Sequence, residues 1–439
     1  MQGQCWRKIK MNKNEIADKI LSLSLERGAG KAQCVVTSQI KTEIYYEQGK
    51  ISLLRTLFNN TVTIKVLKNQ KKGVVAQNTF ENPEKAVDEA LSAAEYAKPD
   101  DAEDICDEIN TKTFTEGNLE PDREAMYNGL VKFISDSKQK YPKISFDSIT
   151  IEHLLITRLY KNTNGVSMEE TRGFYVFSSM FMALDADKTS SFNASEAVFL
   201  DPKTDFMSLG MTERLLAETE KQVDTKTLDG KFVGSLVITP QCMEDIIGTV
   251  EGNFLSDGVL MNNTSLFKDK LDKQVASQNV SIYANPLTPG LAGGYSVTGE
   301  GFAAENMAII ENGILKNFIL SRYGAKKTGL QRSKNEGGCL VMTPGEKSLE
   351  QIIKNTERGI LLNRFSGGEP GVDGDITGVA KNSFLIENGK ITDALSETMI
   401  SGNLASMLMN ITDISNETVT NGDYVLPYVK IDKVTISGK

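Results

Sequence analysis

The sequence predicts an α+β protein in which N-terminal units of mixed helix and strand precede a β-rich C-terminal domain. Helical patterns with capping residues alternate with strand patterns up to residue 230, whereas residues 231–439 are rich in glycine and short apolar runs. A hydrophobic fraction of 40% and a charged fraction of 24% are ordinary for a globular chain. With 439 residues, the chain is long enough for two or three domains.

Residues 12–98 are expected to form an N-terminal α+β domain. Apolar residues at helical spacing predict a helix over 12–27, which ends before Gly28. Four strands are expected next, at 34–37, 42–46, 52–56 and 61–67. Asn82 then caps a helix that begins at Pro83. One face of this helix is predicted to consist of Ala86, Ala90, Ala93 and Ala97.

Residues 99–120 are expected to be an acidic linker. The run 99–108 carries six acidic residues and little that could pack, which predicts a solvated loop. The middle α+β domain, 121–230, is expected to begin with a helix at Pro121 and to end with a helix over 205–221. Its strands are predicted at 145–159, 167–172 and 175–185, with a two-residue hairpin turn at Asn164-Gly165.

The C-terminal domain, 231–439, is predicted to be rich in short strands, with helices at 241–254 and 348–358. Asn312-Gly313 and Asn388-Gly389 lie between apolar runs and predict two hairpins of one turn type, because Asn and Gly tolerate positive φ. The segment 299–304 matches a dinucleotide-binding pattern. A strand rather than a helix is predicted after it, so no nucleotide site is expected there.

Composition limits the partners and the compartment. A net charge of −9 and a pI near 5.1 argue against a nucleic-acid partner, which needs clustered Lys and Arg. No apolar run approaches the roughly 18 residues that span a bilayer, so no membrane partner is expected. The five cysteines form no C-x-x-C pair and suit reduced thiols in the cytoplasm. Met1–Lys10 lacks the apolar core of a secretory signal and is either an extension or lies before a true start at Met11.

The single histidine, His153, lies in an alternating run and shares a face with Ile149, Ile151 and Leu155. A lone histidine on an apolar strand face is usually structural, and any Ser–His or Cys–His mechanism would have to use this residue. No catalytic residue is therefore expected in this chain.

The segment 366–378 is rich in glycine. Glycines let another chain approach closely, and exposed strand edges pair with a peptide of any sequence, so one interpretation is a peptide groove. The other is a tight bend at a dimer seam, and both stay open. The residues assigned to this groove or seam are Gly367, Gly368, Gly374, Asp375, Asn382 and Ser383.

Several C-terminal segments resemble one known family. The longest are Arg364-Phe365-Ser366-Gly367-Gly368-Glu369-Pro370, 371–391 and Glu397-Thr398-Met399-Ile400-Ser401-Gly402-Asn403, with further matches at 285–286, 312–315, 321–330 and 426–427. Together they resemble the TldD/PmbA family, bacterial and archaeal proteins associated with intracellular peptide proteolysis. The resemblance covers most of the chain from about residue 30 onward.

The resemblance implies where a zinc site would lie. Active family members hold zinc through His-Glu-x-x-x-His and a late Cys, which correspond to segments near 243–254 and 416–423. Neither segment contains a histidine or a cysteine. The degenerate zinc-helix region carries Glu244, Asp245, Gly248, Glu251 and Asn253 instead. No metal or cofactor is therefore expected in this chain, because zinc favours imidazole and thiolate ligands.

The missing motif points to the PmbA branch of the family, also called TldE. This branch implies a subunit of a cytoplasmic metalloprotease that degrades or processes unfolded peptides and pairs with a zinc-bearing TldD-like subunit. Two other hypotheses stay open. One is a stand-alone homodimeric peptide-binding protein, and the other is a hydrolase that uses Glu244, Asp245 and Glu251.

Overall fold

The computed structural model describes residues 12–79, 81–368 and 370–438. The expectations for Met1–Lys10 lie outside the described residues. Helices make up 23% and strands 43% of the structure, which confirms the α+β class. The strands of the described chain form an N-terminal sheet of eight strands and a C-terminal sheet of fourteen.

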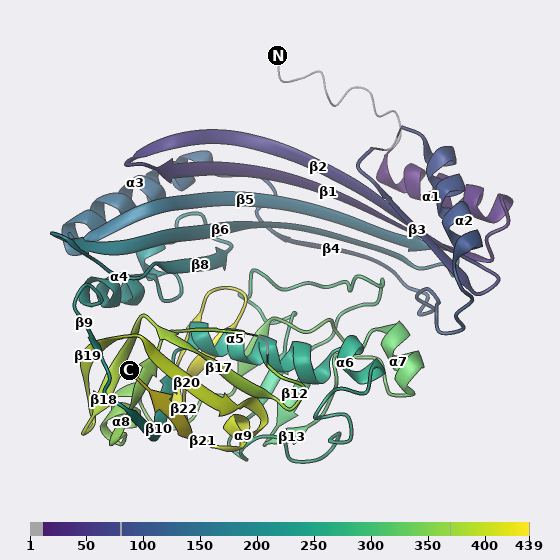
Figure 1. Ribbon diagram of the computed structural model, residues 1–439. Coiled ribbons are helices and arrows are strands. Elements are labelled where there is room, and N and C mark those ends of the chain that lie inside the picture. The colour runs from purple at the N-terminus through teal and green to yellow at the C-terminus, as the bar shows by residue number, and fades with distance from the viewer. Residues whose placement is uncertain (1–11, 80, 369, 439) are drawn as a thin grey trace.

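The N-terminal sheet is long and curved, and it lies over the C-terminal part of the molecule (Figure 1). Its strands run in the order β3-β2-β1-β5-β6-β4, and β7 and β8 also pair with β6. The strands are β1 Lys31–Glu47, β2 Lys50–Lys68, β3 Lys71–Gln77, β4 Thr111–Gly117, β5 Ile144–Asn162, β6 Ser167–Asp185, β7 Lys188–Thr189 and β8 Asn193–Phe199. Helices α1 (Lys13–Glu26) and α2 (Pro83–Tyr96) lie at one end of this sheet, and α3 (Arg123–Lys140) and α4 (Thr212–Lys221) lie at the other (Figure 1).

The two expected units 12–98 and 121–230 contribute strands to one sheet. β1 pairs antiparallel with β5 from Gln33 to Glu47, so the strand ladder crosses the boundary that was expected between them. A long curved sheet of this kind presents one face to the C-terminal part of the molecule (Figure 1).

Several strands are longer than the sequence predicts. The pairs of short strands expected within 34–46, 52–67 and 167–185 are the single strands β1, β2 and β6. The predictions were wrong because polar residues interrupt the apolar pattern, whereas the backbone ladder continues through them. Ser38, for example, pairs with Asn60 on one side and Thr157 on the other. Similarly, Asn164-Gly165 lies within the loop 163–166 and is not a two-residue turn.

The predicted helix caps are present, but two helices differ in detail. The Asn82 side chain caps α2, as predicted. On this helix Ala94 is buried, Ala93 is exposed and Ala97 is the C-cap, because the buried stripe also includes Val87 and Leu91 and is therefore rotated away from Ala93. The helix predicted over 205–221 is broken at Gly210, whose φ of +53° separates a short 3-10 turn from α4.

The expected linker 99–120 contains strand β4, which pairs parallel with β6. Its acidic run 99–108 is not the solvated loop that was predicted. Three of its side chains are buried: Ala102, Ile105 and Cys106. Asp104 accepts hydrogen bonds from Lys31 of β1 at 2.6 Å and from Arg322 of the C-terminal part at 2.8 Å. The prediction missed this packing because the cationic partners of the segment lie far away in the sequence.

The C-terminal sheet consists mostly of short strands, as predicted. They are β9 Thr225–Thr227, β10 Lys231–Ile238, β11 Ile282–Ala284, β12 Met307–Glu311, β13 Ile314–Leu315, β14 Leu340–Met342, β15 Arg358–Leu362, β16 Arg364–Gly367, β17 Asp375–Lys381, β18 Ser383–Glu387, β19 Lys390–Ser396, β20 Thr398–Asn403, β21 Ile411–Thr420 and β22 Val425–Ser437. The helices are α5 Pro240–Val250, α6 Asp257–Met261, α7 Arg322–Thr328, α8 Leu349–Lys354 and α9 Leu404–Met409. Within the described ranges, no helix is both long and apolar enough to cross a membrane.

Both predicted hairpins are confirmed, and they share one turn type. Asn312 and Asn388 each have a φ of 49°, and Gly313 and Gly389 follow with φ of 78° and 75°. Positive φ at both central residues is the type I′ geometry that Asn-Gly favours.

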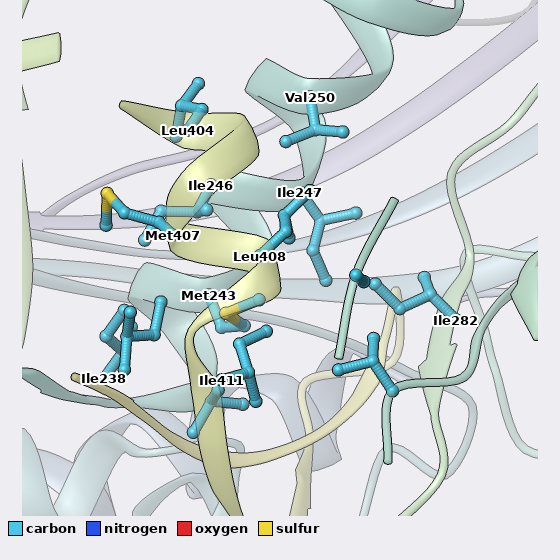
Figure 2. Close-up of a cluster of buried hydrophobic side chains, with 14 of the residues drawn as sticks. Ile238, Met243, Ile246, Ile247, Val250, Ile282, Leu404, Met407, Leu408 and Ile411 are labelled. Atoms are coloured by element: carbon cyan, nitrogen blue, oxygen red, sulfur yellow. The ribbon is translucent and has the colours of Figure 1, made fainter. Parts of the chain in front are cut away.

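Helix α5 lies at the top of the C-terminal part, facing the N-terminal sheet (Figure 1). A π-helical turn, Glu251–Leu255, extends it, so the helix predicted over 241–254 is confirmed. Figure 2 shows the apolar side of α5 packed against α9. The side chains labelled there on these two helices are Met243, Ile246, Ile247, Val250, Leu404, Met407 and Leu408. This burial fixes the rotation of α5 about its axis and turns its polar face away from the core.

Candidate functional site

The polar face of α5 lines a cavity of about 720 Å³. Helical periodicity separates the two faces, because residues three and four positions apart share a side. The helix and the π-helical turn contribute Gln241, Glu244, Asp245, Gly248, Thr249, Gly252 and Asn253. Four of the five residues assigned to the degenerate zinc-helix region therefore lie on one wall.

Two other segments complete the cavity. Glu196 comes from β8 of the N-terminal sheet, and Asn421, Asp423 and Tyr424 come from the loop between β21 and β22. Backbone contacts hold these segments together, because the Val198 N–H donates to the carbonyl of Asn421 at 2.6 Å. The cavity thus lies where the N-terminal sheet meets the C-terminal part, a common position for ligand sites.

The cavity is strongly acidic. Burial, together with the negative charges of Asp423, Asp245 and Glu196, raises the pKa of Glu244 to about 7. Burial also raises the pKa of Asp245 and of Asp423. In the part of the chain that the structure describes, no ion pair engages any of these four carboxylates. Ionising them together is costly, so a bound cation would be favourable.

Tyr424 contributes a hydroxyl to the same wall. The residue is only 2% exposed, and its side chain lines the cavity. Its backbone N–H donates to Asn421, but its hydroxyl makes no hydrogen bond with the rest of the described chain. The hydroxyl lies close enough to Glu244 and Asp245 for their charges to raise its pKa.

The residues that line this cavity fit zinc poorly. Their side chains offer carboxylates, amides and hydroxyls, whereas zinc prefers imidazole and thiolate. Over the described ranges, no three His, Cys, Asp or Glu side chains are placed so that they could hold one metal ion. The four carboxylates are therefore spread around the cavity rather than gathered on a point.

The Gly-rich segment lies next to this cavity. A second pocket of about 160 Å³ is lined by Gly367 and Gly368 of the predicted groove, and it shares Asp245 and Thr249 with the larger cavity. Its other lining residues are mainly apolar: Ile246, Phe365, Pro370, Ile376 and Leu404. The fold thus places two segments that are more than a hundred positions apart on one continuous surface.

The other residues assigned to the groove or seam lie outside both pockets. Gly374, with a φ of +84°, packs close to Phe254, and Asn403 donates to Asp375 at 2.9 Å. These contacts hold the turn before β17 against the end of the α5 helix.

Asn382 and Ser383 join the two parts of the molecule. The Asn382 side chain donates to the carbonyl of Phe192 at 2.8 Å, and Gln222 donates to the carbonyl of Ser383 at 3.0 Å. Both residues are buried. Their contacts are structural links between the C-terminal sheet and the segments around β8 and α4.

Glu251 does not line the cavity. Its carboxylate accepts a hydrogen bond from the N–H of Gly338, and burial raises its pKa to about 7. The trio of carboxylates considered for a hydrolase is therefore divided between two environments.

His153 has a structural environment. It is 1% exposed, its Nε2 donates to the carbonyl of Asn118 at 2.7 Å, and its ring packs against Tyr175. Burial lowers its pKa. The dinucleotide-like segment 299–304 precedes strand β12 rather than a helix, as predicted.

Sequence reasoning missed Glu196 and Tyr424, and it reached Asn421 and Asp423 only as part of the segment 416–423, where the resemblance implies the late cysteine. A single glutamate in a strand has no distinctive pattern, and a polar residue in a turn is ordinary. Only the contact of β8 with the loop before β22 brings them to α5.

Comparisons with known proteins agree with this architecture. Residues 233–438 match the model of the PmbA/TldA metallopeptidase C-terminal domain. The metalloprotease PmbA of Escherichia coli O157:H7 is 24% identical over 454 residues, covering 95% of this chain and 96% of that protein. A metalloprotease of Methanocaldococcus jannaschii is 26% identical over 412 residues, covering 85% and 87%. The crystal structure of TldE from Thermococcus kodakarensis has the same fold, with a TM-score of 0.83 and 19% identity over 96% of this chain and 100% of that one.

Proposed function

Because this chain belongs to the TldD/PmbA family of metalloproteases, we propose that it is a PmbA/TldE-like subunit that binds unfolded peptides without cutting them. In this proposal a TldD-like partner carries the zinc and performs the cleavage, and the two subunits act in the cytoplasm. The chain itself contributes peptide binding and one side of the enclosing surface.

The donor set beside α5 carries this proposal. The resemblance locates the zinc helix of active relatives near 243–254 and their late cysteine near 416–423. The same two segments line the cavity of about 720 Å³ here, and they bring carboxylates, amides and hydroxyls to it. A chain that keeps the walls of the zinc site but lacks residues suited to bind zinc is expected to position the peptide for a partner subunit that holds the metal.

The edge strand β16 supports peptide binding. Within the described sheet, β16 pairs with β17 only, so its other edge has no strand partner. Gly367 at its end is exposed and lines the apolar pocket beside α5. An extended peptide that adds to this edge would place its side chains near both pockets.

Co-expression with a TldD-like chain that carries His-Glu-x-x-x-His tests the proposal. We expect a stable complex that contains zinc and cleaves an unfolded peptide. The isolated chain is expected to contain no zinc and to leave the peptide uncut. Cleavage by the isolated chain that persists after chelation would reject the proposal. A homodimer that binds peptide and never associates with the TldD-like chain would instead support the stand-alone peptide-binding function.

A further inference from the structure

We propose that the cavity beside α5 recognises the cationic group of a peptide, either a lysine or arginine side chain or a free N-terminal ammonium. This inference rests on the proposed peptide-binding function and names the class of peptide that the site takes.

The shape of the acidic surface favours an organic cation. Glu196, Glu244, Asp245 and Asp423 come from three separate segments and surround a volume of about 720 Å³. Among the residues described here they do not converge closely enough to hold a metal ion. An ammonium or guanidinium group carries several N–H donors that point in different directions, so it can satisfy carboxylates on more than one wall.

The Tyr424 hydroxyl is a second, independent indication of a ligand. It belongs to a side chain that is 98% buried (2% exposed), it faces the cavity, and it makes no hydrogen bond with the rest of the described chain. The hydroxyl oxygen itself is accessible from the cavity, so a ligand there can reach it. A ligand nitrogen in the cavity would provide the missing donor.

The charges around Glu244 support a cation as the missing partner. The charges of Asp423, Asp245 and Glu196 all raise its pKa, and no cation lowers it. Two arginines lie nearby: Arg172 lowers the pKa of Asp423 and Arg364 lowers that of Asp245, in both cases by less than burial raises it. Arg172 also forms an ion pair with Glu116 and donates to a backbone carbonyl, so its charge is already shared.

The adjoining apolar pocket adds a second requirement for the peptide that binds. It shares Asp245 and Thr249 with the acidic cavity and has room, at about 160 Å³, for one apolar side chain. The preferred peptide is therefore extended, with a cationic group and an apolar side chain a few positions apart.

Calorimetric titration of the full chain with a set of short, unstructured peptides tests the inference. The reference peptide is acetylated and amidated and contains one lysine and one leucine. Its analogues replace lysine by glutamine, or carry glutamine together with a free N-terminus. We expect the lysine peptide to bind about tenfold more tightly than the blocked glutamine peptide, since one charge-assisted contact is worth roughly 1.5 kcal/mol. Tight binding of the analogue with a free N-terminus would identify the N-terminal ammonium as a cationic group that the cavity binds.

Variants of the cavity give the matched comparison. Glu244→Gln and Asp423→Asn should each remove most of the preference for the lysine peptide, and Tyr424→Phe should weaken its binding about threefold. The control is Glu350→Gln, which makes the same change at an exposed position on α8 outside both pockets and should leave binding unchanged. Binding of the lysine peptide should also strengthen between pH 6 and pH 8, because Glu244 ionises in this range.

Two outcomes would overturn the inference. One is equal affinity for all three peptides, so that neither the lysine peptide nor the analogue with a free N-terminus binds more tightly than the blocked glutamine peptide. The other is binding of Ca²⁺ or Mn²⁺ alone that depends on Glu244 and excludes the peptides, which would make the cavity a metal site. Since these titrations need no second subunit, a failure to associate with a TldD-like chain would reject the proposed heterodimer and leave this result intact.

Discussion

At the scale of single residues, environment decides what each chemical group can do. The chain has one histidine, and the fold encloses it between Tyr175 and the carbonyl of Asn118. It has many carboxylates, and the fold places four of them around one cavity, where partial burial and their mutual repulsion outweigh the nearby arginines. Glu244 is the clearest case, with a pKa of about 7.

Glu244→Gln should stabilise the protein at high pH. The pKa of this carboxyl is about 7 in the folded chain and 4.5 in its reference state, so folding favours the protonated form. Its contribution to stability is full below pH 4.5 and is lost as the pH rises through 7. The variant, which cannot ionise, should therefore unfold at higher urea concentration than the parent at pH 8 and at nearly the same concentration at pH 4.5.

Urea unfolding of parent and variant at both pH values checks this, with Glu350→Gln as the exposed control. A Glu244→Gln variant that is no more stable than the parent at pH 8 would show that solvent reaches the carboxylate.

His153→Ala should destabilise the protein by about 3 kcal/mol without changing peptide binding by the folded chain. The substitution leaves a cavity beside Tyr175 and removes the hydrogen bond to Asn118. Chemical unfolding gives the first quantity, and titration with the lysine peptide gives the second. Reduced binding by a variant of unchanged stability would argue for a direct role of the histidine.

At the scale of elements, glycine has opposite roles in β6 and in α5. A Cβ built at Gly173 would overlap the carbonyl oxygen of Asn118, where the chain leaves β4. A Cβ at Gly248 meets no atom within 4 Å, because this residue faces the cavity. Strand β6 needs glycine at position 173 because the backbone after β4 lies against it. Helix α5 has no such contact at position 248, and there glycine only lowers the stability of the helix.

The pair Gly173→Ala and Gly248→Ala tests this difference with one chemical change. We expect the first to lower the free energy of unfolding by about 2 kcal/mol, because the backbone of the segment after β4 must move. The second should raise it by about 0.5–1 kcal/mol through helix propensity. Equal effects of the two substitutions in urea unfolding would contradict this assignment.

At the scale of the whole molecule, the acidic segment 99–108 fastens the N-terminal sheet to the C-terminal part. Asp104 bridges Lys31 of β1 and Arg322 of α7, and Asp100 pairs with Lys327 at 2.8 Å. The carboxylates of this segment thus pair with cationic side chains of the N-terminal sheet and of the C-terminal part, and these ion pairs are partly shielded from solvent.

Asp104→Asn should therefore lower the free energy of unfolding by about 1–2 kcal/mol at low ionic strength and by less in 1 M salt, since salt screens partly exposed pairs. Asp101→Asn, at an exposed neighbouring position, is the control and should have little effect. Unfolding curves at the two salt concentrations measure the difference, and an effect of Asp104→Asn that does not depend on salt would rule out the electrostatic explanation.

Much of the architecture was accessible from the sequence, because it depends on local patterns. Cap residues such as Asn82, the two Asn-Gly turns and the periodicity of the helix after Pro240 act within a few positions of the chain. The chemistry of the segment 243–254 was also visible, since the absence of histidine needs no structure to be read.

The tertiary structure decided where these pieces meet. Strand length depends on a backbone partner, so the polar interruption at Ser38 could not reveal that β1 is continuous. The contacts of Asp104 and the approach of Glu196 and Tyr424 to α5 join residues far apart in the chain. Local sequence determines helices, turns and the donors available, whereas burial and charge at a site depend on long-range packing, which no single segment encodes.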